Sequence, residues 1–170
     1  DSGKKRWLYP DGCIFGNTAS FESPASDGET TYGFGGAIYS EGANVIVSGG
    51  YIFSNSAKTN SEGGGGLYCR KSSAVTMDSG YVTNNKAQNV VCEGAHSNED
   101  GGGGIRLEEQ SNLTLNGGYI TGNMAGSGAG ICVRGKRSDA MLTMNGGYIC
   151  ANRNQVPCGI ASHQHEGAGI

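Results

Sequence analysis

The chain has 170 residues, of which 32 are glycine and 16% are charged, and its formal net charge is −3. So small a charge, with both signs scattered along the chain, excludes the basic surface that nucleic acid or an anionic membrane requires. No apolar run approaches the roughly 18 residues needed to cross a bilayer, so we expect no membrane insertion. The glycines lack the period of collagen, and the apolar positions are too regular for a disordered tail.

The first eleven residues precede any recognisable repeat. They contain Trp7-Leu8-Tyr9, which would suit a cap over the open end of a repeat array. We therefore expect residues 1–11 to form an N-terminal cap or linker and residues 12–170 to form one repeat domain. The chain lacks an initial methionine and stops at Ile170, inside what looks like another repeat. We expect it to be a piece of a longer protein.

From residue 12 onward the chain repeats three short pieces. A glycine run ends in an apolar residue, as in Gly64-Gly65-Gly66-Leu67, and an alternating run follows, as in Leu113-Thr114-Leu115. The third piece is Gly-Tyr-Ile-x-x-Asn or its valine version, as in Gly118-Tyr119-Ile120-Thr121-Gly122-Asn123. Alternation predicts short strands with one buried face, and glycine permits tight corners between them. Three strands per repeat predict an all-β parallel β-helix solenoid of about five rungs.

Stacked rungs place equivalent residues in columns about 4.8 Å apart. Apolar residues of the three pieces would fill the interior. The asparagine that ends the third piece would stack in a turn, where each amide can bond its neighbours above and below. We interpret this row as structural; it comprises Asn17, Asn55, Asn85, Asn123 and Asn152.

The connections between repeats alternate in length. Long ones are expected at roughly 18–34, 86–101 and 153–167, so long loops should occur on alternate rungs. Loops in solenoids gather on one face, which is often the binding face.

A tyrosine precedes the inward isoleucine or valine of the third piece, so its ring should point outward. An exposed row of rings could bind sugar rings or a protein, or it could only stabilise the pairing of rungs. The row comprises Tyr51, Tyr81, Tyr119 and Tyr148. Tyr39 and Tyr68 would form a shorter exposed stack on another wall.

Cleavage of a polysaccharide would need carboxylates clustered on one wall, for calcium binding or for acid/base catalysis, together with a positioned arginine or lysine. The candidate acids Asp78, Glu108, Glu109 and Asp139 occupy non-equivalent places in different repeats. We interpret them as solvated charges at turns, and we expect a non-catalytic protein without a cofactor.

Two of the long loops contain residues that bind metals. One holds Cys92 and His96, and the next on the same face holds Cys158, His163 and His165. These side chains could bind Zn²⁺, the two cysteines could form a Cys92–Cys158 disulfide, or the loops could be unlinked. We favour the disulfide. Cys69 falls in an inward row and should be a small core residue, whereas Cys132 and Cys150 should point outward.

The recurring Gly-Gly-x-Ile and Leu-Thr-Met-Asn-Gly-Gly-Tyr-Ile-x-x-Asn motifs resemble repeats of very large surface proteins of gut-dwelling Gram-positive bacteria. They also resemble the paired repeats of chlamydial polymorphic outer-membrane proteins. The resemblance covers about residues 12–170, and it implies a right-handed, pectin-lyase-like β-helix that is displayed outside the cell and is often adhesive.

We therefore expect an extracellular module of a bacterial surface protein, acting as an adhesin or rigid stalk. Its partner would be a carbohydrate or a host surface protein. One alternative is a polysaccharide lyase or hydrolase, because pectin-lyase-like helices host such enzymes. Another is a subunit of a surface filament that self-associates through its open C-terminal end, where strand edges would be unpaired.

Overall fold

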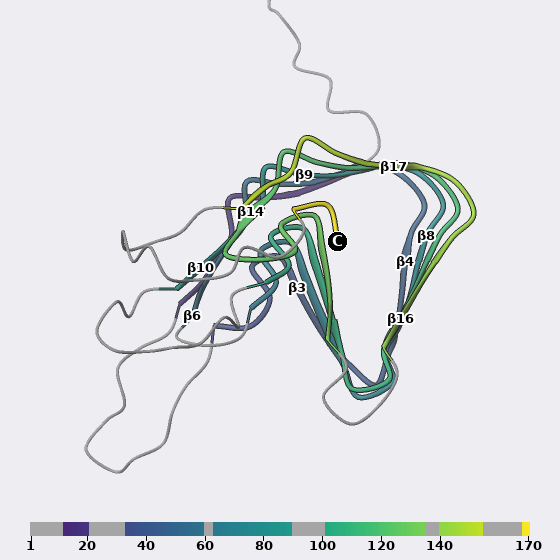
Figure 1. Ribbon diagram of the computed structural model, residues 1–170, viewed down its shortest axis with the longest axis horizontal. Helices are drawn as coiled ribbons and strands as arrows, with labels where there is room; N and C mark the ends of the chain where they lie inside the picture. The colour runs from purple at the N-terminus through teal and green to yellow at the C-terminus, as the bar shows by residue number, and fades with distance from the viewer. Residues whose placement is uncertain (1–11, 21–32, 60–62, 90–100, 135–139, 155–167) are drawn as a thin grey trace, which may run out of the picture.

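The computed structural model is an all-β parallel β-helix that describes residues 12–20, 33–59, 63–89, 101–134, 140–154 and 168–170. Its strands form four parallel sheets; each of the first four coils contributes one strand to every sheet, and the fifth contributes a strand to two of them. In Figure 1 the chain turns anticlockwise as it approaches the viewer, so the β-helix is right-handed, as expected. The described residues include no helix long and apolar enough to span a membrane.

We name each sheet after its most distinctive side chains. The tyrosine sheet consists of β1 (Cys13–Phe15), β5 (Tyr51–Phe53), β9 (Tyr81–Thr83), β13 (Tyr119–Thr121) and β17 (Tyr148–Cys150). The alanine sheet follows it in each coil and consists of β2 (Thr18–Ser20), β6 (Ser56–Thr59), β10 (Lys86–Asn89), β14 (Met124–Ala125) and β18 (Arg153–Asn154).

The other two sheets complete each coil. The charged sheet consists of β3 (Ile38–Glu41), β7 (Leu67–Arg70), β11 (Ile105–Glu108) and β15 (Ile131–Arg134). The threonine sheet consists of β4 (Asn44–Val47), β8 (Ala74–Met77), β12 (Asn112–Leu115) and β16 (Met141–Met144). It leads back to the tyrosine sheet at the upper right of Figure 1.

The prediction of three strands per rung was wrong, because a fourth strand follows each asparagine. Sequence pattern missed the alanine sheet because its strands, two to four residues long, contain only one large apolar residue, Met124. Their inward side chains are mostly alanine, which is depleted in strands. Ala57, Ala87 and Ala125 are buried there. The expected long loops at roughly 18–34, 86–101 and 153–167 therefore begin with the strands β2, β10 and β18.

The connections from the alanine sheet to the charged sheet alternate in length as expected. Residues 21–37 and 90–104 form the long ones, whereas residues 60–66 and 126–130 form the short ones. Each ends in glycines that pass very close to neighbouring backbone. A Cβ atom on Gly65 would lie 2.4 Å from the carbonyl oxygen of Gly103 and 2.5 Å from backbone atoms of Lys86. Contacts so short are impossible for any other residue, which explains the glycine runs.

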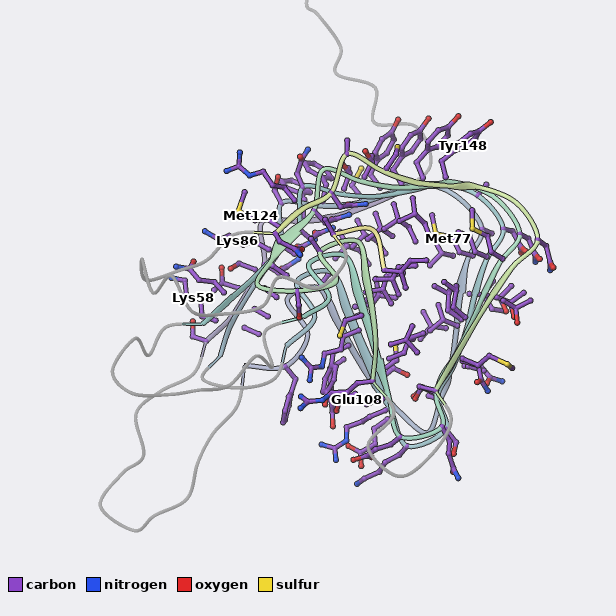
Figure 2. All side chains as sticks on the ribbon, viewed as in Figure 1. Lys58, Met77, Lys86, Glu108, Met124 and Tyr148 are labelled. Carbon is purple, nitrogen blue, oxygen red and sulfur yellow. The ribbon has the colours of Figure 1, made fainter. Side chains whose placement is uncertain are left out.

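The interior is a continuous apolar core, and within each sheet its residues are in register from one coil to the next. Val75 pairs with Leu113, Val82 with Ile120 and Leu67 with Ile105, and all six are buried. Met77 points into this core in Figure 2. The core therefore runs through the central coils and fixes which residues of every strand face outward.

Candidate functional site

The outer face of the tyrosine sheet carries a row of stacked rings, which we call the tyrosine column. It comprises Tyr51, Tyr81, Tyr119 and Tyr148, which pair in register across β5, β9, β13 and β17. Successive ring centroids lie 4.7, 5.0 and 5.0 Å apart, and the ring planes differ by only 5 to 11°. Tyr148 is 60% exposed and points away from the coil in Figure 2. The strands thus hold four phenols in one preorganised row.

The stacking determines which atoms a ligand could contact. Because the rings lie face to face, the inner members present their edges and hydroxyl groups to solvent, and not their faces. Within the part of the chain that the structure describes, none of these four hydroxyls has a hydrogen-bond partner. By contrast, Tyr39 donates to Glu41 and Tyr68 donates to Glu108 on the charged sheet. The tyrosine column therefore offers hydrogen-bonding groups that no described residue uses.

A second outward column lies beside the first, two residues further along each strand. We call it the mixed column, and it comprises Phe15, Phe53, Thr83, Thr121 and Cys150. Phe15 and Phe53 stack with ring centroids 5.1 Å apart, and the Cys150 thiol lies 3.7 Å from the Thr121 hydroxyl. Neither column contains a charged side chain. The tyrosine sheet thus presents a neutral outer wall that is aromatic at one end and richer in hydroxyl groups towards the other.

The charged sheet differs from what the sequence predicted. Glu108 is 7% exposed, so its interpretation as a solvated turn charge was wrong. Arg106 is fully buried, and its Nε atom donates to Glu108 Oε1 at 2.8 Å. Tyr68 is also fully buried and donates to Glu108 Oε2 at 2.6 Å, so it is not an exposed ring. Burial is the largest single effect and lowers the pKa of Arg106, but the charge and hydrogen bond of Glu108, together with the electrostatic effects of Cys132 and Tyr68, outweigh it and raise the pKa.

The remaining acids of this wall are paired as well. Glu109 accepts two hydrogen bonds from Arg70, at 2.6 and 3.2 Å, which raise the pKa of Arg70. Glu41 is paired with Lys71, whose hydrogen bond lowers the pKa of Glu41. Sequence alternation places Arg106 and Glu108 on one face, and this i, i+2 spacing is the signal that could have revealed the cluster. Asp78 is exposed and accepts from Asn116, and Asp139 lies outside the described residues.

The five asparagines form a hydrogen-bonded ladder at the corner between the tyrosine and alanine sheets. Asn85 Nδ2 donates to Asn123 Oδ1 at 3.1 Å and to the carbonyl oxygen of Ile52 at 2.8 Å. The same pattern links Asn17 to Asn55, Asn55 to Asn85, and Asn123 to Asn152. The residue before each asparagine has φ between 53 and 69°, as at Asn84. The ladder is thus occupied with holding the corner together.

The remaining candidate ligands lie outside the described residues: Cys92, His96, Cys158, His163 and His165. Both the zinc site and the Cys92–Cys158 disulfide therefore stay predictions. The described residues contain no group of three or more histidine, cysteine or acidic side chains that could hold a metal ion. Cys69 is buried in the core, where desolvation raises the pKa of its thiol to about 12.

Comparison with known proteins identifies no relative. No protein-family model, no curated protein and no solved structure matches the chain.

Proposed function

We propose that this chain is a rigid, non-catalytic β-helix module of a bacterial cell-surface protein, and that it binds carbohydrate through the outer wall of the tyrosine sheet. The observation that carries the proposal is the tyrosine column, whose four aligned hydroxyls have no partner among the described residues. The placement at the cell surface rests on the resemblance of the repeat motifs.

The chemistry of the column suits a sugar ligand. Tyrosine offers an apolar ring and a polar tip, which match the C–H groups and hydroxyls of a saccharide. Parallel stacking and in-register strands already hold the rings in place. Little side-chain entropy is therefore lost on binding, a cost that otherwise amounts to about 0.5–1.5 kcal/mol for each immobilised side chain.

The pairing of the acids favours binding over catalysis. A glycoside hydrolase needs one carboxylate as acid and another as base or nucleophile, both directed at the substrate. Glu41, Glu108 and Glu109 are instead held by Lys71, Arg106 and Arg70. Each of these ion pairs neutralises a carboxylate that could otherwise act as acid, base or nucleophile. The charged sheet is therefore better suited to stabilising the coils.

A glycan and mucin array tests the proposal with three proteins. Wild type is compared with a variant in which all four column tyrosines become phenylalanine, which keeps the stack and removes the hydroxyls. The control variant, Thr76→Ala/Thr114→Ala/Thr143→Ala, removes outward hydroxyls from the threonine sheet of three of the same coils. Circular dichroism checks that all three proteins fold.

We expect wild type and the control to bind the same glycans. The phenylalanine variant should lose binding to these glycans. Each lost hydroxyl should weaken binding by about 0.5–1.5 kcal/mol where it bonds the ligand. The proposal is wrong if no glycan binds the wild type, or if the phenylalanine variant binds as well as the wild type does.

A further inference from the structure

We infer that the ligand is a single uncharged, extended polysaccharide chain lying along the solenoid axis, across the strands, between the tyrosine column and the mixed column. This inference rests on the proposed function and adds the class of ligand, its direction and a second row of contacts. Thr83 and Thr121 of the mixed column become specificity-determining residues.

The spacing of the columns sets the direction of the ligand. Along the axis, equivalent groups recur every 4.7 to 5.0 Å, once per coil. Along a strand, the outward face offers only two side chains, because Val82 and Ile120 between them point into the core. A polymer of identical units meets a repeated environment only if it runs along the axis. A chain lying across the axis would contact one coil and leave the others unused.

The distance between the columns limits the ligand to one chain. Residues two apart on a strand are separated by about 7 Å, so Tyr81 and Thr83 flank a narrow strip of backbone. Thr121 flanks the same strip one coil further on, opposite Tyr119. A ligand in this strip can bond phenol hydroxyls on one side and threonine hydroxyls on the other.

The charge of the wall selects a neutral polymer. Neither column contains an acidic or basic side chain, whereas the charged sheet carries Glu41, Arg70, Arg106 and Glu108 on its outer face. The charged groups of an anionic polysaccharide would lose their bound water without gaining a compensating cation on the tyrosine sheet, and this desolvation costs free energy. A neutral polysaccharide exchanges hydroxyl–water bonds for hydroxyl–hydroxyl bonds at little cost.

The test measures binding of defined oligosaccharides by calorimetry. The probes are β-1,4-linked oligomers of glucose and of N-acetylglucosamine with two, four and six units, and oligogalacturonate of the same lengths as the anionic comparison. The variant is Thr83→Val/Thr121→Val, which keeps side-chain shape and strand propensity while removing both hydroxyls. Its matched control is Thr76→Val/Thr114→Val, which makes the same change on β8 and β12, the threonine-sheet strands that directly precede β9 and β13.

We expect a neutral oligomer to bind, to gain affinity from two to six units, and to keep its Kd within about twofold in high salt. The Thr83→Val/Thr121→Val variant should bind about 5- to 10-fold more weakly, and the control should be unchanged. Preference for oligogalacturonate, equal affinity at all lengths, or wild-type affinity in the Thr83→Val/Thr121→Val variant would overturn the inference while leaving the proposed function standing. Absence of binding to every glycan would overturn both.

Discussion

Replacement of Asn85 by alanine should destabilise the β-helix far more than the same change at the end of the ladder. The Asn85 side chain takes part in four hydrogen bonds, of 2.8 to 3.1 Å, with Ile52, Asn55 and Asn123. Its removal leaves the backbone N–H group of Asn55, a residue only 1% exposed, without its acceptor. A buried orphan donor costs about 1–3 kcal/mol, and the other lost bonds about 0.5–1.5 kcal/mol each. We expect a total loss of about 3–5 kcal/mol.

The matched control is Asn17→Ala, at the exposed first position of the same ladder. The Asn17 side chain donates one bond, to Asn55 Oδ1 at 3.0 Å, and the backbone N–H of residue 17 keeps that acceptor. Its loss should cost about 1 kcal/mol or less. Thermal unfolding followed by circular dichroism should show a drop in Tm of about 10 °C for Asn85→Ala and of a few degrees for Asn17→Ala. Equal shifts in the two variants would refute the view that the buried ladder holds the corner.

Two further predictions concern a glycine and a cysteine. Gly65→Ala should destabilise the fold by several kcal/mol or prevent folding, because its Cβ would collide with the backbone of Gly103 and Lys86. The control Gly49→Ala should fold normally, because the nearest atom to its Cβ would be the Ser79 hydroxyl oxygen at 3.7 Å. Solubility and Tm of both variants test this, and equal Tm values would contradict it. Cys69 has its pKa raised to about 12 in the folded protein, so its contribution to stability is complete below the thiol's ordinary pKa near 9 and is lost as pH rises towards 12. Denaturant unfolding between pH 8 and 11 should therefore show a steeper loss of stability in wild type than in Cys69→Ala. Parallel curves of stability against pH would show that burial does not control the pKa of this thiol.

The sequence was sufficient for the fold class because its repeats show the register directly. In the motif ending at Asn123, alternation assigns Ile120 inward and Tyr119 outward, and both assignments hold. The alanine sheet could not be found in the same way. Its strands carry one small inward residue each, such as Ala87, and an isolated alanine has no periodicity to detect. Their pairing depends on neighbouring coils, which only the assembled structure supplies.

The candidate sites also divide into features that the sequence predicts and features that only the assembled structure shows. The outward direction of Tyr148 follows from alternation alone, whereas the lack of a partner for its hydroxyl among the described residues depends on everything that surrounds it. Glu108 was misjudged for the complementary reason. Its partners Arg106 and Tyr68 come from two coils, and the ring of Phe34 stacks on that of Tyr68 with the centroids 5.2 Å apart. Such contacts between coils cannot be predicted from the spacing of residues within one repeat.

The contrast between the two outer walls bears on why the tyrosine column carries hydroxyl groups. Stacking by itself does not require them, because Phe15 and Phe53 stack at 5.1 Å on the same sheet. On the charged sheet the hydroxyl of Tyr68 satisfies a buried carboxylate, and its loss would leave Glu108 short of a donor. The hydroxyls of Tyr81 and Tyr119 satisfy nothing within the described residues, so their removal should leave the stability of the fold unchanged. A group that is dispensable for folding and is displayed in register on a neutral wall is available for contact with something outside the chain.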